Sequence, residues 1–141
     1  MSRGMLEDLV GLTDMLYRAE QAKMRDLIQQ EASLRQALSQ LEDRRKATLA
    51  LPAEELHTVR QIGADILWQG WVGRNRDELN RQLALCLAQK ARLLTKLRQA
   101  YGKHQAAETV LEQEKAARQE TRGRRQIAQE QGLALIRASQ S

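Results

Sequence analysis

Leucine recurs with helical spacing along the first third of the chain. Leu27, Leu34 and Leu41 fall seven residues apart, and Leu38 completes a second row. Apolar residues repeated at this spacing form one stripe along a helix. No proline occurs in this stretch, so the pattern predicts a first helix over about residues 5–50. We expect the stripe to extend toward the start of the chain through Leu9, Leu12 and Leu16.

The stretch that follows carries signals that interrupt a helix. Pro52 cannot continue the preceding helix, and it pushes the residue before it out of the helical region. Asn75 and Glu78 have the spacing of a capping box that would restart a helix. We therefore predict a bend over about residues 51–63 and a second helix over about residues 64–138. The glycines that weaken the early part of this helix are Gly63, Gly70 and Gly73.

Two rows at seven-residue spacing run along the second helix, as in a coiled coil. One row consists of Val72, Leu79, Cys86, Leu93, Ala100 and Ala107. The other consists of Leu83, Lys90, Leu97, His104 and Leu111. After Leu111 the same positions become polar, so we expect the rest of the chain to lack an intramolecular partner. With so little apolar area, the last ~30 residues are expected to fray alone and to become helical on a partner.

The two helices match each other if the chain folds back at the bend. Positions whose numbers add to about 113 would then face one another, which aligns both stripes from a single turn. The pairs are Leu41 with Val72, Leu34 with Leu79, Leu27 with Cys86, Glu20 with Leu93, Leu16 with Leu97, and Leu9 with His104. The predicted fold is all-α: one long antiparallel two-helix coiled-coil hairpin over residues 1–141, with a C-terminal overhang. An obligate parallel dimer is the alternative, and Pro52 and the matched register favour the monomeric hairpin.

Composition agrees with a thin core between two helices. Phe is absent, aromatic residues make up 3% of the chain and charged residues 29%. Ala, Leu, Gln, Glu, Lys and Arg predominate, and these residues favour helices over strands. The net charge of +5 permits an acidic partner without requiring one. One Cys and the absence of any apolar run of ~20 residues indicate a cytoplasmic protein.

No arrangement of residues in the sequence points to catalysis. The chain has no glycine-rich phosphate loop, and His57, His104 and the single Cys86 are too far apart in sequence for zinc-site spacing. We expect His104 to be a polar position within the seam and Cys86 to be a small buried residue. The sequence therefore predicts no enzyme, no cofactor and no metal site.

Two features are candidates for binding protein partners. Trp68 and Trp71 are three residues apart and hence on one helix face, where they either anchor a partner or close the end of the hairpin. The second feature is the basic stretch Lys115, Arg118, Arg122, Arg124 and Arg125. This stretch forms a solvated helix face or binds an acidic protein surface, and nucleic-acid binding is the third alternative. Tyr101 alone supplies too little base stacking for nucleic-acid binding.

The chain resembles the FliJ/YscO family of small coiled-coil proteins of flagellar and type III secretion export. The resemblance rests on the run from Leu67 to Trp71, the stretch from Leu97 to Leu111 and the opening Leu16-Tyr-Arg-Ala-Glu-Gln-Ala-Lys. It implies a two-helix coiled coil similar to the stalk of rotary ATPases. It also implies binding to the hexameric export ATPase, the export gate and substrate chaperones.

Carried to this chain, the resemblance would place residues 6–16 and the basic overhang, with Arg118, Arg122, Arg124 and Arg125, in the ATPase ring. Trp68 and Trp71 would lie away from the ring. Two other functions stay open. One is a basic coiled coil that binds nucleic acid or an anionic surface, and the other is a structural oligomerisation spacer.

Overall fold

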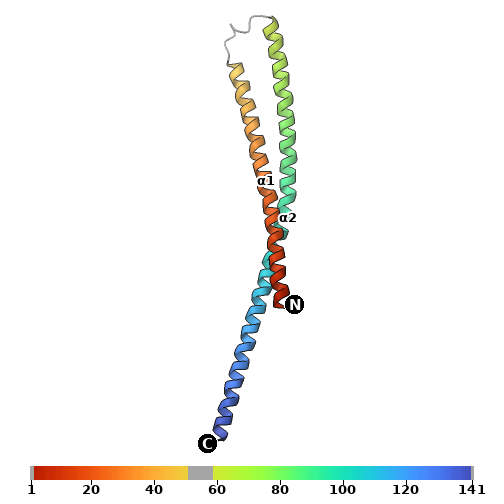
Figure 1. The fold of residues 1–141 in the computed structure, drawn as a ribbon. Helices are drawn as coiled ribbons and strands as arrows, with labels where there is room; N and C mark the ends of the chain where they lie inside the picture. The colour runs from red at the N-terminus through yellow and green to blue at the C-terminus, as the bar shows by residue number, and fades with distance from the viewer. Residues whose placement is uncertain (1, 51–58, 141) are drawn as a thin grey trace. The chain divides into compact units, whose positions relative to one another are not determined.

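The computed structural model describes residues 2–50 and 59–140 of the chain. Helix α1 spans Arg3–Leu49 and helix α2 spans Val59–Ser139, and the described residues contain no strand. The two helices lie side by side and run in opposite directions (Figure 1). The predicted all-α two-helix hairpin is therefore confirmed. Pro52 and most of the predicted bend lie outside the described residues.

Helix α2 begins at Val59, earlier than the expected start near residue 64, and continues without a break. Its glycines lower helix stability by about 1 kcal/mol each relative to Ala but do not end the helix. No described glycine adopts a positive φ. The Asn75 side-chain amide donates a hydrogen bond of 3.2 Å to the Trp71 carbonyl within the same helix. The helix restart that the spacing of Asn75 and Glu78 would allow does not occur, and α2 is continuous there.

The chain divides into two compact units, each of which pairs part of α1 with part of α2. One unit comprises Met1–Ala19 and Leu97–Ser141, and the other comprises Glu20–Lys96. Each unit has its own buried seam. The seam of the second unit contains Met24, Leu34, Leu41, Val72, Cys86 and Leu93. The seam of the first contains Leu6, Thr13, Ala107 and Leu111.

In the unit Glu20–Lys96, one predicted seam pair is seen directly. The Cys86 thiol, with 1% of the residue exposed, lies 3.5 Å from the Leu27 carbonyl. The expectation that Cys86 is a small buried residue is confirmed. Lys90 also occupies a seam position, where its ammonium donates to Glu31 Oε1 across the seam at 3.0 Å. Arg35 donates to the other Glu31 oxygen at 3.2 Å, so the carboxylate joins both helices.

In the other unit, the register differs from the predicted one by about one helical turn. His104 lies opposite Thr13, with 3.2 Å between Nδ1 and Oγ1, whereas the sequence pattern placed Leu9 there. The Thr13 hydroxyl also lies 2.9 Å from the Leu9 carbonyl, so this polar side chain is satisfied inside the seam. Leu12 and Leu16, expected to be part of the stripe, are each 54% exposed.

Aromatic and charged groups complete the surroundings of His104. Its ring lies parallel to that of Tyr17, with 6.3 Å between the ring centroids, and its Nε2 lies 3.0 Å from Glu108 Oε1. Tyr17 also contacts Tyr101 at a centroid distance of 5.4 Å. With 13% of its side chain exposed, His104 is a polar seam position, as the sequence predicted.

Replacement of a seam leucine tests how much the thin core contributes to stability. We expect Leu34→Ala to reduce the free energy of unfolding by about 2–3 kcal/mol, because Leu34 is 8% exposed. Leu85→Ala, at a position 52% exposed in the same unit, should cost less than about 0.5 kcal/mol. Urea unfolding followed by circular dichroism measures both values. Equal losses for the two variants would contradict the assigned seam.

The Glu31 contact predicts a pH dependence of stability. Hydrogen bonds from Lys90 and then Arg35 lower the pKa of Glu31 below its usual value. A lowered pKa stabilises the fold at pH values above the usual pKa, and this stabilisation is lost as the pH falls through the folded-state pKa. We expect Glu31→Gln to lower the thermal midpoint by a few degrees at pH 7 and to have little effect near pH 3. Asp43→Asn, at an exposed position, serves as the control. A Glu31→Gln deficit that persists at pH 3 would refute this assignment.

Candidate partner-binding surfaces

Helix α2 continues beyond the part that α1 covers. Leu111 is the last buried residue, and no described residue from 112 to 140 is buried. In Figure 1 this part of α2, in blue, extends beyond the start of α1 with no helix beside it. We refer to residues 112–139 of α2 as the overhang. The position of α1 in the seam thus leaves a long stretch of helix open to other molecules.

The overhang is helical along its whole length, and the expected dependence of its order on a partner stays a prediction. Ion pairs between successive turns account for part of this helicity. Arg118 pairs with Glu114 at 2.9 Å, and Arg124 pairs with Glu120 at 2.6 Å. The remaining residues are largely Ala, Gln and Arg, which have high helix propensity.

Three of the four predicted arginines lie together on one face of the overhang. Arg118, Arg122 and Arg125 line a shallow depression of about 380 Å³. We call these three residues the basic face. Arg124 does not line this depression and is instead paired with Glu120. Among the described residues, no carboxylate lies within ion-pair distance of Arg122 or Arg125.

The basic face lies on the same side of α2 as the seam, but its side chains are basic. Arg118 and Arg125 occupy the heptad row that includes Leu111, at intervals of seven residues. Where that row packs against α1, leucines alternate with the paired polar side chains of Lys90 and His104, and beyond α1 the row presents guanidinium groups. A guanidinium can donate two parallel hydrogen bonds to one carboxylate. The arrangement is therefore suited to an acidic surface that lies along the overhang.

The predicted tryptophan pair lies near the start of α2, in a stretch with several exposed apolar side chains. Trp71 is 46% exposed and Trp68 is half-buried. Ile66 and Leu67 are more exposed still, at 66% and 74%. Among the described residues, these side chains form an apolar surface on α2. The structure thus leaves Trp71 accessible to a partner.

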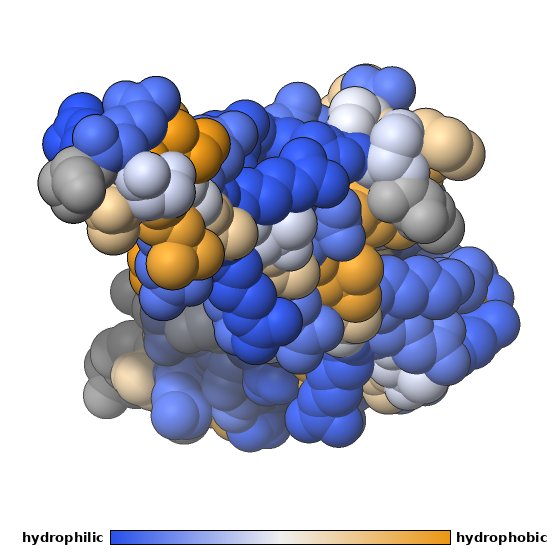
Figure 2. Space-filling model, turned by 90° about the horizontal axis from the view of Figure 1, so that it is seen from below, coloured by the Kyte–Doolittle hydropathy of each residue, from blue (hydrophilic) through white to orange (hydrophobic). Residues whose placement is uncertain are grey.

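Another set of exposed apolar residues lies on the first turns of α1 and was missed from the sequence. These residues are Met5, Leu12, Met15 and Leu16, all more than half exposed. Figure 2 shows hydrophobic side chains, in orange, at the surface among hydrophilic ones. Sequence analysis assigned Leu12 and Leu16 to the seam because they are leucines near the right spacing. The polar Thr13 occupies the seam instead.

The side chains that the sequence analysis considered for chemistry, Cys86 and His104, both lie in the seam. No cluster of three or more His, Cys, Asp or Glu side chains could hold a metal ion in this part of the chain. The Cys86 thiol is buried against the Leu27 carbonyl. His104 is in contact with Thr13 and Glu108. Neither α1 nor α2, as described, has a stretch long and apolar enough to cross a membrane.

No protein-family model, no curated protein and no solved structure matches the chain.

Proposed function

We propose that the chain is a non-catalytic stalk and adaptor of a flagellar or type III secretion export ATPase. In this proposal it binds the ATPase hexamer, the export gate and substrate chaperones, as the sequence resemblance to the FliJ/YscO family implies. It acts in the cytoplasm and is peripheral to the inner membrane through its partners. The ATPase supplies the chemistry, so the chain itself requires no cofactor.

One observation supports the proposal most directly: in a helical hairpin, α2 extends beyond the start of α1. The overhang presents Arg122 and Arg125 with no ion-pair partner among the described residues. Its first turns follow directly after the buried Leu111. A helix of this kind can enter the central opening of a ring while the seam holds it to α1. Guanidinium groups would then meet acidic side chains of the ring subunits.

A stalk can couple ATP hydrolysis to export only if its contacts differ between states of the ring. A ligand shifts an equilibrium by its difference in affinity for the two states. The basic face suits this role because it occupies one side of the overhang, so a given ring subunit meets it in some rotational positions only. Each subunit facing the arginines would be stabilised in one nucleotide state. As ATP is hydrolysed, the ring subunit that the arginines stabilise would change from one subunit to the next.

The test is stimulation of ATP hydrolysis by a purified export ATPase from the same genome. We expect the wild-type chain to raise the rate. Arg122→Glu with Arg125→Glu should weaken the apparent affinity at least about tenfold, because two interfacial charges are reversed. This pair leaves the helical ion pairs of Arg118 and Arg124 in place.

The matched control is Arg25→Glu with Arg44→Glu, which makes the same change in net charge at exposed positions of α1. It should leave the stimulation within twofold of wild type. Loss of stimulation in both variants would show a general charge effect and would remove the assigned contact. No binding or stimulation by the wild-type chain would overturn the stalk proposal. RNA or DNA affinity that falls steeply with salt would favour the nucleic-acid alternative.

A further inference from the structure

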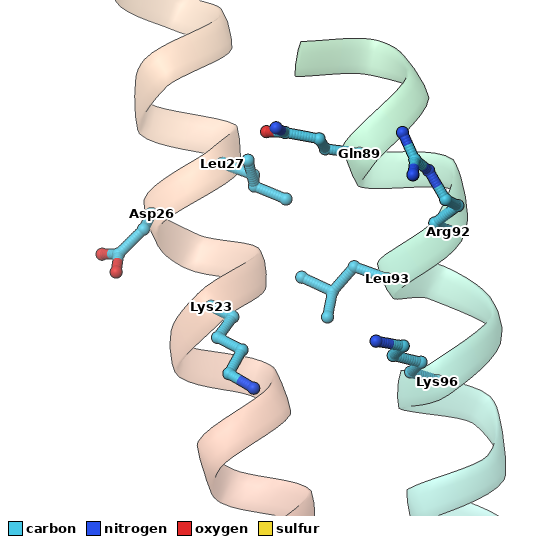
Figure 3. A pocket seen from close by; sticks show the side chains of 7 residues that line it. All are labelled: Lys23, Asp26, Leu27, Gln89, Arg92, Leu93 and Lys96. Carbon is cyan, nitrogen blue, oxygen red and sulfur yellow. The ribbon is translucent and has the colours of Figure 1, made fainter. Parts of the chain in front are cut away.

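A groove opens between the two helices within the unit Glu20–Lys96. It has a volume of about 420 Å³ and an apolar floor formed by Leu27 and Leu93. Leu93 is 8% exposed, whereas Leu27 keeps part of its surface accessible. Figure 3 shows the two leucines directed toward each other from α1 and α2. Because the core is only two helices thick, no third element among the described residues covers this floor.

The rim of the groove is basic. It consists of Lys23 on α1 and of Arg92 and Lys96 on α2, together with Gln89. Figure 3 shows the Lys96 ammonium group directed from α2 toward the gap between the helices, whereas the Lys23 side chain runs along α1. Asp26, the one acidic residue at the groove, points away from it. The groove therefore has a net positive rim above an apolar floor.

These cations are poorly neutralised within the chain. Lys23 lies 3.4 Å from Glu20 Oε1, and its side chain is 65% exposed. No carboxylate of the described residues pairs with Arg92 or Lys96. Arg92 and Lys96 are exposed cations beside the apolar floor, so an entering carboxylate could pair with both of them. The charge pattern thus selects an anionic occupant.

We propose that this groove docks an acidic amphipathic helix of a partner protein. The gap between two packed helices accepts a third helix, whose apolar face would cover Leu27 and Leu93. Arg92 and Lys96 are four residues apart on one face of α2, so they match acidic residues spaced three or four apart on the incoming helix. Lys23 would engage the opposite flank of that helix. The partner sequence is thus expected to carry apolar residues at helical spacing, flanked by Glu or Asp.

The apolar floor favours a protein helix over nucleic acid. Nucleic-acid strands bind through backbone phosphates and through stacking on aromatic side chains, and no aromatic residue lines this groove. A helix gains from both parts of the groove, because its apolar side chains are buried and its carboxylates are paired. The groove does not involve the basic face of the overhang. Its occupancy can therefore be tested whether or not the chain binds an export ATPase.

The probe is a stapled, fluorescein-labelled helix of about 18 residues, with Leu along one face and Glu on both flanks. Anisotropy titration with the full-length chain is expected to give a Kd of about 10–100 µM at low salt. Arg92→Glu with Lys96→Glu should weaken binding at least tenfold. Arg74→Glu with Arg98→Glu, at exposed positions of α2, should change it less than twofold.

Four comparisons decide the outcome. A peptide with Lys in place of Glu, or one with Gln in place of Leu, should lose at least tenfold in affinity. Equal binding of either peptide, or equal losses in the groove variant and the control variant, would overturn the proposal. A uridine 15-mer that competes with the probe at lower concentration than the unlabelled peptide would also overturn it, because the groove would then be a nucleic-acid site. Circular dichroism confirms that each variant is helical.

Discussion

A seam between two helices can bury only one stripe of each helix, because each helix has only one neighbouring helix to cover it. This constraint governs the rest of the molecule. The buried residues recur at intervals of seven, and polar residues enter the seam only with partners. Thr13 meets His104, and Lys90 meets Glu31. Glu20 is satisfied only in part, because its Oε1 lies 3.4 Å from the Lys23 ammonium while its buried Oε2 has no hydrogen-bond partner among the described residues.

The same constraint explains what the sequence could predict. The rows on α2 were read correctly, because Val72, Cys86 and Leu93 keep a strict seven-residue spacing and are buried. The start of α1 was read wrongly, because it has more leucines than one stripe can bury. Spacing alone could have identified Thr13, which is seven residues from the buried Leu6. The unbroken helix at Asn75 could not be predicted, because the capping-box pattern is also compatible with a helix interior.

A thin core leaves much of both helices available to other molecules. Candidate surfaces follow from where the seam ends or stays uncovered. Beyond Leu111 the seam row becomes the basic face, and between Leu27 and Leu93 the seam stays open as a groove with a basic rim. The arginines of the basic face were predicted from the sequence. The groove was not predicted, because its position depends on how α1 and α2 are aligned with each other. Both surfaces offer cations to acidic partners, which is consistent with an adaptor that holds more than one protein.

The central claim is that α1 and α2 of one chain bury each other. The most direct measurement is the thermal midpoint of the helical signal over a hundredfold range of protein concentration. An intramolecular seam predicts one cooperative transition with the same midpoint at every concentration. A midpoint that rises steadily with concentration would show that the seam forms between chains, and would contradict the hairpin.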